Sequence, residues 1–151
     1  MKHILSVLIP ALLLFSCDPC TDCDPFNYEP TVELQFVRVE IEDEVKKNTI
    51  ITNPLIYWDN VSGFLEFKEG INKFPVPLSY TDMQSEYTMV MEGIMFSLVL
   101  DYDLEKQFDA NRRVIIRALN IDSVSHTFDS LVFKCGSFGC VDKQTSITCY
   151  F

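Results

Sequence analysis

The sequence predicts an all-β protein, an antiparallel β-sandwich of immunoglobulin-like architecture with about eight strands. Three observations lead to this fold class. From Cys17 onward, 49 of 135 residues are Val, Ile, Thr, Phe, Tyr or Trp, which favour strands, and only two are Ala. Short alternations of apolar and polar residues recur along residues 31–151. There is no internal repeat, so we expect residues 31–151 to form a single domain.

The first two strands follow from period-two alternation. Over residues 31–41 the apolar positions are even-numbered up to Phe36 and odd-numbered from Val37. Such a switch of faces requires a bulge or a change of sheet. A charged hairpin loop at residues 42–47 is expected to separate this strand from a second one over residues 49–58, which Asn53 and Pro54 interrupt.

The middle of the sequence predicts four further strands, over residues 63–68, 72–80, 86–92 and 94–102. Pro75 and Pro77 lie two residues apart, so both missing N–H groups would face the same neighbour. We therefore expect residues 72–80 to form an edge strand that is protected against further pairing. Residues 94–102 are apolar on both faces, and this strand should lie centrally in its sheet.

The last strands are predicted over residues 113–121, 124–135 and 144–151. Residues 101–111 form the only segment in which we expect a helical turn. Alternation within the strand 124–135 places His126 on the same face as Val124 and Phe128. We interpret His126 as a packed or hydrogen-bonded strand histidine rather than a catalytic base.

The N-terminus has the pattern of a secretory signal peptide. Lys2 and His3 form a short basic region, and residues 4–15 form an apolar run of 12 residues. That run spans about 18 Å as a helix, less than the hydrocarbon core of about 30 Å. Residues 1–16 are therefore predicted to be a signal peptide. Residues 17–30 contain three Pro, four acidic residues and no basic residue, which predicts an extended, flexible tether.

Residues Leu14, Phe15, Ser16 and Cys17 resemble the lipobox of bacterial lipoproteins, with an aliphatic residue three before the Cys and a small residue directly before it. The resemblance implies cleavage before Cys17 and acylation of Cys17. Two or more acyl chains hold a protein firmly at a bilayer without spanning it. The resemblance also implies a protein anchored in the bacterial cell envelope, with the outer membrane as the expected location and the leaflet left open. The domain that follows resembles the small β-sandwich lipoproteins that have no assigned activity.

Five cysteines follow the expected acylation site, and export to an oxidising compartment favours disulfides among them. The first-choice disulfide joins Cys135 to Cys140, the second choice joins Cys20 to Cys23, and Cys149 is expected to be a buried free thiol.

We expect neither a metal nor another cofactor. The run from Cys17 to Cys23 resembles part of a ferredoxin-type motif, but its fourth ligand is missing. A structural zinc site needs a second pair of ligands, which the sequence does not supply. Four acidic residues occupy calcium-loop positions, but a Lys and an Arg stand where that loop needs Gly and Glu. These four are Asp101, Asp103, Glu105 and Asp109, and we interpret them as a solvated acidic loop.

Composition and motifs restrict the function. The 22 acidic residues outnumber the 12 basic ones, giving a net charge of −10, which argues against a nucleic-acid partner and against charge-driven binding to an anionic membrane. No nucleophile elbow, phosphate-binding loop or metalloprotease motif is present, so no enzymatic activity is expected.

The best candidate for ligand binding is the adjacent pair Tyr57 and Trp58. Neighbouring strand residues point to opposite faces, so one ring should be in the core and the other could stack on a sugar. We expect a lipid-anchored binding or structural module with a protein partner in the envelope. The alternatives are a carbohydrate-binding module that uses Tyr57 and Trp58, and a metal or redox protein based on the cysteines.

Overall fold

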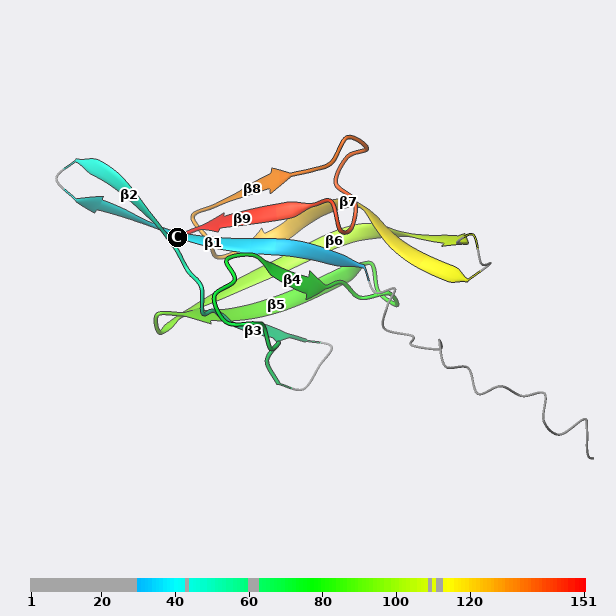
Figure 1. Ribbon diagram of the computed structural model, residues 1–151, viewed down its shortest axis with the longest axis horizontal. Coiled ribbons are helices and arrows are strands. Elements are labelled where there is room, and N and C mark those ends of the chain that lie inside the picture. The colour runs from blue at the N-terminus through cyan, green and yellow to red at the C-terminus, as the bar shows by residue number, and fades with distance from the viewer. Residues whose placement is uncertain (1–29, 43, 60–62, 109, 111–112) are drawn as a thin grey trace, which may run out of the picture.

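The protein folds into two β-sheets that pack face to face, as a computed structural model shows for residues 30–42, 44–59, 63–108, 110 and 113–151 (Figure 1). The predicted all-β sandwich is confirmed. The nine strands are β1 (Thr31–Glu42), β2 (Val45–Ile50), β3 (Leu55–Trp58), β4 (Phe74–Pro77), β5 (Gln84–Met91), β6 (Ile94–Phe108), β7 (Val114–His126), β8 (Ser130–Lys134) and β9 (Ser146–Tyr150). These described residues form no helix, and hence none that could cross a membrane. The predicted signal peptide, Cys17 and nearly all of the tether lie outside the described residues.

The first sheet has the order β2-β1-β9-β8, with β4 also paired to β1, and the second has the order β3-β5-β6-β7. Every strand pair is antiparallel except β1 with β9, which is parallel. In that pair Glu33 lies opposite Ser146, and Val37 lies opposite Tyr150. The sandwich predicted to be antiparallel therefore contains one parallel pair, and β9 runs parallel to β1 on one side and antiparallel to β8 on the other.

Strand β1 changes partner where its apolar pattern changes face. Residues up to Leu34 pair with β4, and residues from Val37 pair with β2. Phe36 and Val37 are both buried at the change. The backbone N–H of Ile51 donates to the carbonyl of Phe36 at 3.0 Å, where the chain leaves β2. The switch therefore accompanies a change of neighbour within one sheet, and β1 does not move to the second sheet.

The edge position predicted for residues 72–80 is confirmed. Within the described part of the chain, β4 pairs with β1 alone. The N–H of Leu78 donates to the carbonyl of Pro30 at 2.7 Å. Alternation then directs the nitrogens of Pro75 and Pro77 away from β1, so this outer edge offers no N–H at either position. The central position predicted for residues 94–102 is also confirmed, since β6 lies between β5 and β7.

Several predicted boundaries are wrong. Residues 63–68 form no strand, and only Phe64 makes an isolated bridge, to Tyr57. A helical turn is expected from the sequence within residues 101–111, but residues 101–108 form strand, because β6 continues to Phe108 and pairs with β7. The predicted break near residue 122 is absent, and the chain turns instead at residues 127–129.

The hairpin between β1 and β2 is shorter in its loop than predicted. Glu42 pairs with Val45, so the ladder extends to the last residue of β1 and the first residue of β2. Lys46 and Lys47 belong to β2, where Lys47 pairs with Glu40. Opposite charges on paired strand residues favour such an extension of the ladder.

Apolar side chains from both sheets fill the space between them. Phe96 and Phe128 stack with ring centroids 4.8 Å apart, and Phe36 packs against Phe128 at 6.0 Å. Two hairpins extend past this core, at opposite ends of the long axis of the molecule (Figure 1). We call them the β1–β2 arm, which includes Val39–Glu42 and Val45–Asn48, and the β6–β7 arm, which includes Leu104–Phe108 and Val114–Ala118.

Candidate functional site

Three exposed apolar side chains lie together on and beside β3, and we call Leu55, Tyr57 and Phe64 the β3 surface. The rings of Tyr57 and Phe64 meet edge to face, with centroids 6.3 Å apart and an interplanar angle of 73°. Exposed apolar side chains that gather in this way are a common feature of binding surfaces.

The local sequence explains why these side chains face outward. Ile56 and Trp58 point into the core, so the alternate residues Leu55 and Tyr57 point away from it. Trp58 is 8% exposed and Tyr57 is 37% exposed. The two aromatic residues therefore lie on opposite faces as expected, and Tyr57 is the one of the pair that a ligand at the surface can reach. The indole N–H of Trp58 has no hydrogen-bond partner among the described residues.

Phe64 joins the β3 surface because the chain returns along β3. The N–H of Leu65 donates to the carbonyl of Ile56 at 2.7 Å. This contact and the bridge to Tyr57 hold Phe64 beside the exposed aromatic ring. The sequence did not single out Phe64. Its position beside Tyr57 depends on one isolated backbone bridge, and no sequence pattern near Phe64 predicts that bridge.

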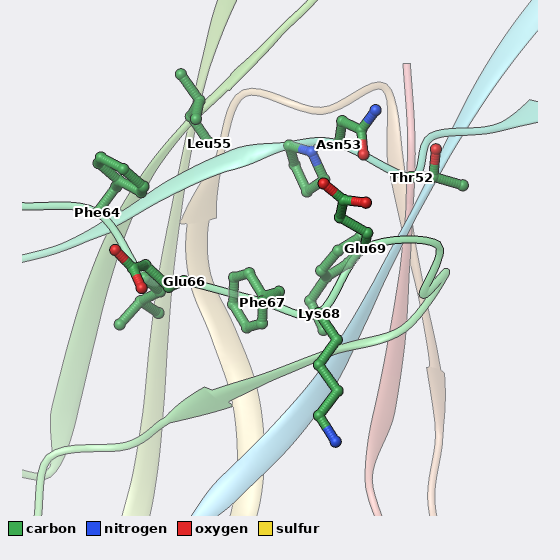
Figure 2. A pocket seen from close by; sticks show the side chains of 11 residues that line it. Thr52, Asn53, Leu55, Phe64, Glu66, Phe67, Lys68 and Glu69 are labelled. Carbon is green, nitrogen blue, oxygen red and sulfur yellow. The ribbon is translucent and has the colours of Figure 1, made fainter.

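A pocket of about 310 Å³ adjoins the β3 surface. Figure 2 shows Leu55 and Phe64 on one side of it, Asn53 and Glu69 on the other, and Phe67 between them. The ring of Phe67 packs edge to face against Phe74 at 5.2 Å. The pocket thus combines an apolar lining with amide and carboxylate oxygens at its rim, which suits a small ligand with one apolar face and several hydroxyl groups.

The cysteines divide into two groups. Cys135 and Cys140 form a disulfide, the pair that the sequence favoured, with Cα atoms 4.5 Å apart. Cys149 is buried in β9 and forms no disulfide with a described residue. Burial raises the pKa of its thiol to about 12, so the thiol is neutral and a poor nucleophile at physiological pH. Cys17, Cys20 and Cys23 lie outside the described residues, and their acylation, pairing or metal binding stay predictions.

His126 and three of the four acidic candidates can be placed in the structure, whereas Asp109 lies outside the described residues. His126 is exposed at the end of β7, and its Nδ1 lies 3.0 Å from the carbonyl oxygen of Phe128. Phe128 is buried beyond the end of the strand, so the predicted shared face does not extend to it. Asp103 accepts a hydrogen bond of 2.7 Å from the side-chain amide of Asn120. Among the residues that the structure describes, no three His, Cys, Asp or Glu side chains are grouped so that they could hold a metal ion.

Comparisons of this chain with models of known protein families, with curated proteins and with solved structures found no match. The functional argument therefore depends on the residues and on their geometry.

Proposed function

We propose that this chain is a lipid-anchored binding protein of the bacterial cell envelope, which is acylated at Cys17 and binds a protein partner through the β3 surface. The observation that carries the proposal is the lipobox-like run from Leu14 to Cys17 directly after a basic and apolar leader. Acylation at this position would fix the protein to a bilayer without a spanning segment.

The distance between the acylation site and the sandwich supports this arrangement. Strand β1 begins at Thr31, and the 14 residues from Cys17 to Pro30 can extend over at most about 45 Å. Their proline and acidic content favours an extended chain. Such a tether lets the domain reorient above the membrane and present the β3 surface to a partner in the envelope.

Intact mass spectrometry of the protein extracted from membranes with detergent tests the anchor. We expect the mass of residues 17–151 plus two or three acyl chains. Cys17→Ala should abolish the acylation and release the protein from the membrane fraction. Cys20→Ala is the matched control and should leave both unchanged. A wild-type protein of unacylated mass would overturn the proposal.

Crosslinking tests the binding surface. A photoreactive amino acid at Phe64 should give a discrete crosslinked product in intact cells, whereas the same amino acid at Phe138 should not. Phe138 is also exposed, but it lies in the disulfide loop away from β3. The same product from both positions, or none from Phe64, would exclude the β3 surface as the contact.

A carbohydrate ligand is the second candidate function, and the geometry beside Tyr57 favours it. Aromatic rings stack on the apolar faces of sugars, and amide and carboxylate oxygens bind hydroxyl groups. Tyr57 and Phe64 supply the rings, and Asn53 and Glu66 supply the oxygens at the pocket. Titration calorimetry with envelope oligosaccharides should show binding that Tyr57→Ala and Phe64→Ala abolish and Phe138→Ala preserves. Absence of heat with the wild-type protein would exclude this candidate.

A further inference from the structure

The β6–β7 arm exposes apolar side chains on the side that faces the core at its base. Phe108 pairs with Val114, Lys106 with Ile116, and Leu104 with Ala118, so these residues share one side of the ribbon. Ala118 and Leu104 pack in or against the core. The same side continues past the sandwich, where Phe108 is 74% exposed and Val114 is 51% exposed. The apolar side of the arm therefore extends beyond the part that the first sheet covers, and its outer residues are exposed.

The two sides of the arm differ in charge. Phe108, Val114 and Ile116 make the core-facing side apolar, and Lys106 is its only described charged residue. The opposite side carries Glu105 paired with Arg117 and Gln107 paired with Ile115, and Asp103 lies opposite Leu119 at its base. Arg117 binds Asp142 at 3.3 Å. The exposed Phe108 and Val114 therefore lie on the side that holds no described acidic residue, whereas Glu105 and Asp103 lie on the other.

The arm projects from the end of the sandwich at which the tether enters. Lys143 donates from its backbone N–H to the carbonyl of Thr31 at 2.7 Å, and Asp142 donates likewise to Ala118 at 2.9 Å. These bonds connect the start of β1 to the base of the arm. Figure 1 shows the β6–β7 arm at this end and the β1–β2 arm at the other. From Ala118 to Val114 the arm extends by about 13 Å, at about 3.3 Å a residue.

We propose that the core-facing side of the β6–β7 arm lies on the lipid surface to which Cys17 anchors the chain. Phe108 and Val114 enter the boundary between headgroups and acyl chains, and Lys106 reaches the lipid phosphates from the same side. The acidic residues on the opposite side of the ribbon then face water. The inference rests on the proposed lipid anchor, which brings the bilayer to this end of the molecule.

The tether explains why the few apolar side chains of the arm suffice to keep it on the lipid surface. The 14 residues from Cys17 to Pro30 reach at most about 45 Å and join the sandwich at the end from which the arm projects, so the arm is within reach of the bilayer. A short tether of this kind gives a local concentration in the millimolar range. At such a local concentration the arm contacts the lipid surface much of the time, even if the same contacts are too weak to recruit an untethered protein from solution.

Tryptophan quenching tests the inference in the full acylated chain. Phe108→Trp and the control Ile41→Trp are placed in vesicles of phosphatidylethanolamine and phosphatidylglycerol, with and without bromine on the acyl chains. Ile41 is 72% exposed and lies on the β1–β2 arm, at the opposite end. The single natural tryptophan, Trp58, is buried and gives the same background in both variants. We expect bromine to quench and a blue shift to mark the emission of Phe108→Trp, and the emission of Ile41→Trp to stay unchanged.

The other outcomes separate the inference from the anchor. If the acylated chain floats with the vesicles but Phe108→Trp is not quenched, the inference is wrong and the anchor stands. Equal quenching of Phe108→Trp and Ile41→Trp also overturns the inference, because arms at opposite ends cannot both mark one membrane-facing side. A chain that carries no acyl group and does not float overturns the anchor and the inference together.

Discussion

Ser85 belongs to a closed ring of buried hydrogen bonds, and its replacement tests how much such a ring stabilises the sandwich. The N–H of Ser79 donates to Ser85 Oγ at 2.8 Å, and the hydroxyl of Tyr102 donates to the carbonyl of Ser79 at 3.0 Å. Ser85 Oγ lies 2.7 Å from the Tyr102 hydroxyl. Because the single phenolic proton goes to Ser79, Ser85 must be the donor in this last bond. All three residues are buried.

Ser85→Ala leaves the buried N–H of Ser79 without its acceptor and the Tyr102 oxygen without its donor. An unsatisfied buried group costs about 1–3 kcal/mol, so we expect the free energy of unfolding to fall by about 2 kcal/mol. Tyr102→Phe breaks the same ring at another point and should have a similar effect. The double variant should lose less than the sum by about 1 kcal/mol, because either change alone already opens the ring.

Urea unfolding followed by the fluorescence of Trp58 measures these changes, since this tryptophan is buried in the folded protein. The dependence of the free energy on urea should stay as in the wild type. Ser125→Ala, at an exposed position of β7, is the control and should change stability by less than about 0.5 kcal/mol. A Ser85→Ala protein as stable as this control, or strictly additive effects in the double variant, would refute the argument.

Three further changes test other parts of the fold. The pKa of Cys149 is raised, so its thiol stays neutral in the folded state at a pH at which the thiol of the unfolded chain ionises. The free energy of unfolding should therefore fall by roughly 1 kcal/mol between about pH 9 and pH 10. Urea titrations at each pH should show that Cys149→Ala removes this loss. Replacing Cys135 and Cys140 by Ser should lower the free energy of unfolding by about 2 kcal/mol for a loop of six residues, as calorimetry would show. Arg117→Met leaves the buried carboxylate of Asp142 without its cation and should lower the free energy of unfolding, measured with urea, by about 2 kcal/mol. The loss is smaller than for a fully buried pair because Arg117 is partly exposed. An unchanged urea midpoint would contradict this.

The sequence predicted those features that local patterns determine. Alternation identified the all-β class, the central position of residues 94–102, and the opposite orientations of Tyr57 and Trp58. The spacing of Pro75 and Pro77 identified an edge, and the short separation of Cys135 and Cys140 favoured their disulfide. Each of these features involves residues that are close in the chain.

Features that depend on distant partners were missed. The acidic residues after Leu100 resemble a loop by composition, but pairing with β7 satisfies their backbone groups and extends β6 to Phe108. Residues 63–68 alternate like a strand, yet the described structure gives them one bridge and no ladder. Phe64 was missed as a member of the β3 surface for the same reason. Tertiary pairing decides such segments, and no single-sequence pattern encodes it.

The parallel pairing of β1 with β9 sets an order of events during folding. β1 is the first strand of the sandwich and β9 the last, so Glu33 must wait for Ser146 before the centre of the first sheet can form. Until then the edge of β1 opposite β2 and β4 is open, and β8 has no partner in the sheet. Pairings between such distant residues fold slowly, in milliseconds to seconds. A chain that is released from its N-terminus therefore has an unfinished first sheet until β9 is available for pairing, and the unpaired edges of β1 and β8 are exposed to aggregation during that interval.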